Sequence, residues 1–136
     1  MTYKLTILLL FISLASYSQT GTVKVAKPIG QDQMTAVVTL AGLYYGTSSL
    51  DKILKEKKLK LSNNSKLKII DFNVGLLDNA MYYEYTCQGD TLSQEVIKKL
   101  IANNNKKLRL TISPIRARTS GGDTLFLNPI EIKITN

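Results

Sequence analysis

Apolar and polar residues alternate along most of the chain after residue 65, and this alternation constrains the fold more than any other feature. Successive side chains of a strand point to opposite faces, so a period of two predicts strands with one buried face. The clearest strand is predicted over 66–77, with Phe72, Val74 and Leu76 pointing inward. The turn residues Asp78-Asn79 and a second alternating run, 80–88, predict that the chain returns as a hairpin.

Two further strands change face at a proline. The inward residues of 107–117 are predicted to be even-numbered before Pro114 and odd-numbered after it, and the last strand changes in the opposite sense at Pro129. Proline cannot donate to a sheet ladder, so an edge or a bulge is expected at both places. Gly121-Gly122-Asp123 is expected to join these strands as a hairpin turn. The pattern suits a sandwich whose strands bend or switch sheets at its corners.

Two short helices are predicted among the strands. The first begins at Ser48 or Ser49 and reaches about Lys57, with Asp51 three residues after Ser48 in a capping-box-like spacing. The second spans 91–103, where Thr91 and Gln94 fit the Thr-x-x-Gln capping box. Its apolar stripe is expected to comprise Leu92, Val96, Leu100 and Ile101.

The N-terminal residues have the pattern of an export signal. Lys4 precedes an apolar run, Leu5 to Ile12, and small residues stand at Ser16 and Ser18. This spacing fits signal-peptidase cleavage ahead of Gln19. The apolar run is shorter than the ~20 residues that a membrane-spanning helix needs, so no membrane span is expected after cleavage. The mature protein is therefore expected to be periplasmic or secreted.

These signals divide the chain into three parts. Residues 1–18 are the expected signal peptide, 19–45 a lead-in segment with the first strand or strands, and 46–136 the main domain. In the lead-in, 22–26 is expected to be a short edge strand, and a further strand is expected from Thr35 to Leu40 or Tyr44, with Gly46 breaking the chain after it. The expected fold is mainly β: a single Ig-like β-sandwich with two short inserted helices.

The composition argues against catalysis. The chain has no His, the usual general base and the commonest nitrogen ligand of metals, and its ten acidic residues are scattered. No nucleophile stands in a recognised pattern with a base, and no metal or cofactor motif occurs, so neither enzyme activity nor a cofactor is expected. Cys87 is the only cysteine, which excludes an intramolecular disulfide, and it is expected to be a small core residue.

The charge distribution suggests where a partner binds. The formal net charge is +8, and the only arginines are Arg109, Arg116 and Arg118, all on or beside one predicted strand. Arg116 and Arg118 share a face and are candidates for holding a partner's carboxylates. The alternative is an exposed face whose arginines pair with strand neighbours such as Glu131.

A run of lysines between Lys52 and Lys68 forms a second basic feature, with Lys55 and Lys58 as candidate contacts. It suits an acidic protein or an anionic membrane surface, or else is a solvated face that keeps the domain soluble. Tyr82 is the exposed aromatic candidate, but the tyrosines do not interleave with basic residues as a nucleic-acid stacking platform would. Nucleic acid is therefore not expected as a partner.

Several motifs together resemble the C-terminal domain of the GldM (PorM) family, which belongs to gliding motility and type IX secretion in Bacteroidota. The matching segments are Ser49-Leu-Asp-Lys-Ile-Leu, Lys68-Ile-Ile-Asp-Phe-Asn-Val, Gly89-Asp-Thr-Leu-Ser-Gln-Glu-Val-Ile-Lys-Lys-Leu, Leu110-Thr-Ile-Ser-Pro-Ile-Arg-Ala, Gly121-Gly-Asp-Thr and Leu127-Asn-Pro-Ile-Glu-Ile-Lys-Ile. The resemblance covers about residues 46–134. It implies a periplasmic β-sandwich domain that packs as a dimer, contacts envelope partners and has no catalytic residues.

Family members carry a membrane helix and further periplasmic domains ahead of this one, whereas a cleavable signal is expected here. The resemblance therefore favours a free-standing interaction or structural module of the cell envelope, with protein partners and a homodimer as expected associations. An exported binder of carbohydrate or another cell-surface ligand is the alternative, and it requires a concave aromatic site.

Mass spectrometry of the protein purified from its native cell envelope tests the export prediction. We expect an N-terminus at Gln19, because Ser16 and Ser18 place the cut before it. A cytoplasmic form that retains Met1 would contradict the predicted localisation.

Overall fold

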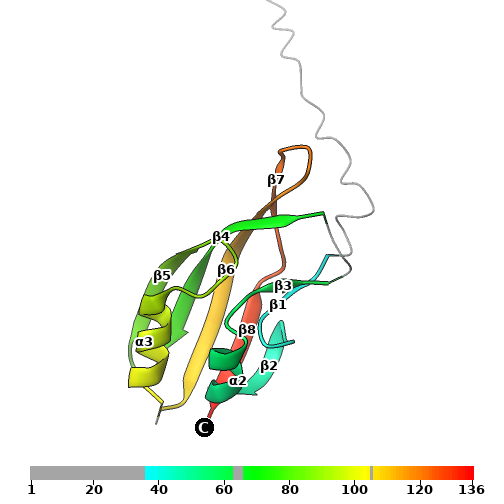
Figure 1. Ribbon diagram of the computed structural model, residues 1–136. Coiled ribbons are helices and arrows are strands. Elements are labelled where there is room, and N and C mark those ends of the chain that lie inside the picture. The colour runs from blue at the N-terminus through cyan, green and yellow to red at the C-terminus, as the bar shows by residue number, and fades with distance from the viewer. Residues whose placement is uncertain (1–35, 63–65, 105) are drawn as a thin grey trace, which may run out of the picture.

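The structure, a computed structural model, describes residues 36–62, 66–104 and 106–136 (Figure 1). The predicted signal peptide (1–18), the predicted edge strand (22–26) and the Asn63-Asn64 turn lie outside these residues. Within the described ranges, no helix is both long enough and apolar enough to cross a membrane.

The described residues are mainly β and form two sheets and two helices, which is consistent with the predicted β-sandwich. The large sheet has the order β2-β8-β6-β4-β5, with β7 paired to the far end of β6. Its strands are β2 (Tyr45–Ser49), β4 (Lys68–Leu77), β5 (Tyr82–Gln88), β6 (Leu108–Arg118), β7 (Thr124–Phe126) and β8 (Ile130–Thr135). The small sheet pairs β1 (Val38–Thr39) with β3 (Lys60–Leu61).

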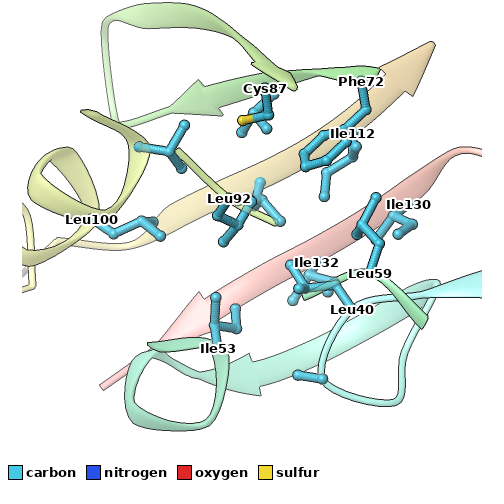
Figure 2. Close-up of a cluster of buried hydrophobic side chains, with 14 of the residues drawn as sticks. Leu40, Ile53, Leu59, Phe72, Cys87, Leu92, Leu100, Ile112, Ile130 and Ile132 are labelled. Atoms are coloured by element: carbon cyan, nitrogen blue, oxygen red, sulfur yellow. The ribbon is translucent and has the colours of Figure 1, made fainter. Parts of the chain in front are cut away.

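The core lies between one face of the large sheet and a layer made of the small sheet, α2 (Leu50–Lys55) and α3 (Gln94–Ala102). Both helices lie on this same side of the sheet (Figure 1). Figure 2 shows Phe72 and Ile112 of the sheet on one side of the cluster and Leu100 of α3 and Ile53 of α2 on the other. We call the sheet face that packs against this layer the inner face, and the opposite one the outer face.

The predicted alternation is confirmed in the central strands. Phe72, Val74 and Leu76 are buried, and β4 and β5 form the expected hairpin. Cys87 is buried on the inner face, and its sulfur accepts a hydrogen bond from the Ser93 N–H at 3.3 Å. The inward residues of β6 also change parity at Pro114 as predicted, since Ile112 and Ile115 are both fully buried.

Two bulges of opposite sense lie between β4 and β6. Ile69 faces Ala117 and Asp71 faces Arg116, so β4 has one extra residue, Ile70. Phe72 then faces Ile115 while Val74 faces Ile112, so β6 has one extra residue around Pro114. The two insertions cancel, and the same register holds at both ends of the pair. The bulge at Pro114 was predicted, whereas that at Ile70 was not.

The last strand breaks at the predicted proline, but it does not change sheets. β7 and β8 both pair with β6, one beyond the other along its length. The break leaves the Asn128 side chain free to reach the small sheet, where its Oδ1 accepts from Val38 N at 2.9 Å and its Nδ2 donates to Val38 O at 3.2 Å. An amide side chain thus takes the place of a strand's backbone and joins the two sheets.

The sequence-based prediction for 35–49 was wrong in two respects. The first strand is only Val38–Thr39, because Leu40 and Leu43 close a tight turn through mutual backbone hydrogen bonds of 2.9 and 3.0 Å. Gly46 does not end a strand but lies inside β2, which runs parallel to β8. With a φ of 131°, Gly46 adopts a conformation that other residues avoid.

Both helices form where predicted, and the cap of α2 is one of the two predicted serines, whereas the cap of α3 differs from the prediction. Ser49 caps α2, and Ser93 rather than Thr91 caps α3, with each hydroxyl accepting an N–H three residues ahead at 3.3 Å. Ile101 was predicted in the apolar stripe of α3 but is exposed, and Ile97 is buried in its place. Ile97 and Ile101 lie one turn apart on the same flank of α3, so the buried part of that flank ends at Ile97.

The two phenylalanines of the described chain allow a matched test of this core. Phe72 is 1% exposed and Phe126 is 71% exposed. We expect Phe72→Ala to lower the free energy of unfolding by about 3–5 kcal/mol, while Phe126→Ala changes it by less than about 0.5 kcal/mol. Urea unfolding followed by circular dichroism measures both. Equal effects would show that the inner and outer faces are assigned wrongly.

Candidate binding surface on the outer face

The outer face of the large sheet is not covered by any element in the part of the chain that the structure describes. Its side chains come from the strand positions that alternate with the core residues, and most are polar or charged. Arg109, Arg116 and Arg118 all lie on this face, because they share the exposed positions of β6. Arg116 and Arg118 therefore share a face as predicted, and Arg109 lies on the same face.

Arg116 is already engaged within the domain. Its Nε donates to Asp71 Oδ1 at 2.7 Å, and a second guanidinium nitrogen donates to Asp71 Oδ2. The hydrogen bond from Arg116 lowers the pKa of Asp71 below its ordinary value of 3.8; burial opposes this shift, and the positive charge of Arg116 adds to it. Fork-shaped pairing of this kind fixes the geometry of both side chains. The predicted role of Arg116 as a free clamp for a partner's carboxylate thus does not fit.

Of the three arginines on this face, Arg118 is the one that makes no ion pair with a described residue. It faces Lys68 of β4 in the register, and among the described residues no carboxylate lies within ion-pair distance of either one. One step along β6, Arg116 faces the exposed ring of Phe126 on β7. We call Lys68, Arg118 and Phe126 the basic cluster. It lies at the β7 end of the sheet, opposite the end where the C-terminus emerges (Figure 1).

A shallow hollow of about 470 Å³ lies near the other end of the outer face. It is lined by residues that stand side by side across the sheet: Leu77, Arg109, Lys133 and Thr47. Arg109 is 3.6 Å from Glu131, the partner weighed in the sequence analysis. The hollow also borders Asp78. The Asp78 carboxylate accepts hydrogen bonds from the Ala80 and Met81 N–H groups and forms an ion pair with Lys106 at 3.5 Å.

Tyr82 is exposed, as predicted, but it does not join the basic cluster. It is 62% exposed and faces Leu77 at the hollow's end of the sheet. Its ring lies against Gly75, where an added Cβ would stand 2.4 Å from the tyrosine hydroxyl oxygen. The absence of a side chain at Gly75 gives the ring room to lie over the sheet, so one side of the ring covers the Gly75 backbone while the side chain stays largely exposed.

The structure separates the predicted lysines from the arginines. Lys55 belongs to α2, and Lys58 follows it, so both lie in the helix layer on the opposite side of the sheet. Lys58 is paired with Asp90 at 3.1 Å. Of the lysine run, Lys68 is the member placed beside Arg118, because it opens β4. The expected cooperation of Lys55 and Lys58 with Arg118 therefore does not fit this geometry.

The described residues contain no group of three or more Cys, Asp and Glu side chains placed to hold a metal ion. No protein-family model matches the chain, and no curated protein matches it in sequence. The geometry of the outer face is therefore what indicates function.

The Asp71–Arg116 pair makes a prediction about acid stability. The pKa of Asp71 is lowered in the folded state, so its contribution to stability is present above its ordinary pKa and is lost as the pH falls through the folded value. We expect Asp71→Asn to melt at a lower temperature than wild type at pH 7, with the gap narrowing below about pH 4. The exposed Asp123→Asn variant is the control, and a gap that does not change with pH would contradict the pairing.

Proposed function

We propose that this protein is a non-enzymatic interaction module of the cell envelope, which binds an acidic protein partner through the basic cluster on the outer face. The observation that carries the proposal is the juxtaposition of Arg118 and Lys68, two cations in register that make no ion pair with any described residue, with the exposed Phe126 nearby. Arginine and aromatic residues are enriched where interfaces gain most of their affinity. Like charges held side by side on a rigid sheet favour an anionic partner.

The resemblance of the chain to the C-terminal domain of the GldM (PorM) family supports the cellular setting. On that basis we propose a periplasmic or secreted location, export through the N-terminal signal, and a relation to gliding-motility and type IX secretion machinery. We also propose that the two sheets are a small variant of the Ig-like sandwich. Burial of one core between the large sheet and its covering layer supports this interpretation.

Arg116 has a positioning role in this proposal. Its hydrogen bonds to Asp71 fix the positions of both side chains on the outer face. Arg118, the next exposed residue of β6, is then the arginine available to a partner. A carboxylate of the partner would meet Arg118 and Lys68 without displacing an existing ion pair. Because neither side chain is ion-paired within the described part of the chain, no described ion pair competes with binding of the partner.

Capture experiments with matched charge changes test the proposal. We expect Lys68→Glu with Arg118→Glu to reduce capture of envelope proteins from a native membrane extract at least about tenfold, since the cations become repulsive. Lys55→Glu with Lys57→Glu makes the same change in net charge in the helix layer and should leave capture nearly intact. Both variants are checked for folding by circular dichroism.

Equal losses in the two variants would show that net charge, and not the basic cluster, governs binding. Enrichment of glycans without protein partners, unaffected by either change, would instead favour the carbohydrate-binding alternative.

A further inference from the structure

One row of facing strand positions crosses the outer face at the hollow, near the end where β8 finishes (Figure 1). From β2 to β5 its members are Thr47, Lys133, Arg109, Leu77 and Tyr82. Lys107, just before β6, borders the hollow as well. We call Lys107, Arg109 and Lys133 the hollow cations. They lie in the middle of the sheet, and the apolar members of the row lie on its β4–β5 side.

The hollow cations are not balanced by carboxylates of the described chain. Neither Lys107 nor Lys133 makes an ion pair with a described residue. Arg109 approaches Glu131 only to 3.6 Å, which is longer than a hydrogen bond, and both side chains are about half exposed. The carboxylate of Asp78, which also lines the hollow, is already held by backbone N–H groups and a lysine. The hollow therefore presents an excess of positive charge to solvent.

Exposed apolar side chains flank this charge at the turn between β4 and β5. Leu77 and Met81 stand on either side of the turn, which is closed by a hydrogen bond of 3.0 Å from Asp78 N to Met81 O. Tyr82 follows, with its ring against Gly75. Leu77, Met81 and Tyr82 are all exposed, and we call them the apolar corner. Exposed apolar groups that lie together mark contacts with proteins or membranes.

The arrangement of the two groups fits a membrane surface better than a protein. In a protein interface the apolar side chains form the centre and the polar ones form the rim. Here the apolar corner lies at the tip of a hairpin, and the hollow cations lie to one side of it. An anionic bilayer offers both environments, because its headgroups attract lysine and arginine and the layer beneath them accepts apolar side chains. Tyrosine suits the boundary between the two.

The next row of the outer face limits how the domain can approach such a surface. Glu131 faces Thr111, Thr111 faces Gly75, and Gly75 faces Glu84. An anionic surface laid across the whole face would repel both glutamates. The contact is therefore expected at the hollow's end of the sheet and not across its face.

We propose that the hollow cations and the apolar corner dock together on a membrane surface rich in anionic phospholipid. The cations meet the lipid phosphates, and the corner enters the boundary between headgroups and acyl chains. This surface lies at the opposite end of the sheet from the basic cluster. The inference therefore does not rest on the acidic-partner proposal.

Co-sedimentation with vesicles tests the hollow cations. The protein should bind vesicles made of equal parts phosphatidylglycerol and phosphatidylcholine, and should not bind phosphatidylcholine alone. Lys107→Glu with Lys133→Glu should weaken binding at least about tenfold, because each reversal replaces attraction by repulsion. Lys68→Glu with Arg118→Glu makes the same change in net charge at the far end of the sheet and should alter binding less than about twofold. Equal losses in the two variants, or a wild-type protein that does not bind, would overturn the proposal.

Tryptophan fluorescence tests the apolar corner. The chain contains no tryptophan, so a single introduced indole reports its own surroundings. The emission of Tyr82→Trp should shift to shorter wavelength when the anionic vesicles are added, since the ring leaves water for the membrane boundary. Phe126→Trp, which is also at an exposed position but at the other end of the sheet, should not shift. A shift of equal size in both variants, or one confined to Phe126→Trp, would contradict the proposed contact.

Soluble phosphate distinguishes a lipid surface from a free ligand. Glycerol phosphate, at the same total phosphate concentration as the vesicles, should neither release the bound protein nor shift the Tyr82→Trp emission, because it offers no apolar layer. Release by glycerol phosphate would show that the hollow binds a free phosphate, and docking on lipid would be wrong. Loss of protein capture in the Lys107→Glu with Lys133→Glu variant, without vesicle binding by wild type, would assign the surface to an acidic protein instead.

Discussion

The pairing of β4 with β6 determines which face of the large sheet is buried. The side-chain period of a strand is two, so a slip of one residue would turn Phe72 and its neighbours toward solvent. The pair contains one extra residue on each strand, and the two insertions cancel. Between them lie the Phe72–Ile115 contact positions on the inner face and the Asp71–Arg116 pair on the outer face. The largest core side chain and the most tightly held ion pair thus depend on the same short stretch of sheet.

This arrangement gives the two faces different roles. The inner face is closed by α2, α3 and the small sheet, which is held in place through Asn128. The outer face carries charged side chains, some of which form ion pairs within the domain. Asp71 neutralises Arg116 and Glu131 lies near Arg109, while Lys68 and Arg118 have no acidic partner among the described residues. A regular sheet holds such side chains at fixed spacing, which reduces the entropy lost when a partner binds.

Local sequence patterns predicted most strands and both helices, but not the bulge at Ile70 or the pairing of β2 with β8. Alternation identified the inward residues of β4 and β6, and Pro114 indicated a bulge, because both signals act within a few residues. The bulge at Ile70 has no proline or glycine to mark it, and without it the Asp71–Arg116 pair could not be foreseen. The position of β2 beside β8 depends on contacts between residues more than eighty positions apart, and Gly46 was read as a break for the same reason. Sequence adjacency likewise grouped Lys55 and Lys58 with Lys68, although the fold places them on opposite sides of the sheet.

The ring of Tyr82 lying on Gly75 has an evolutionary consequence. Any side chain at position 75 would meet the ring, so a mutation there is tolerated only if position 82 has first become small or flexible enough to move away. The reverse order is open, since a smaller residue at position 82 uncovers the glycine without a clash. Among descendants of this sequence, the two positions should therefore change in a fixed order, and a bulky residue should not occur at both.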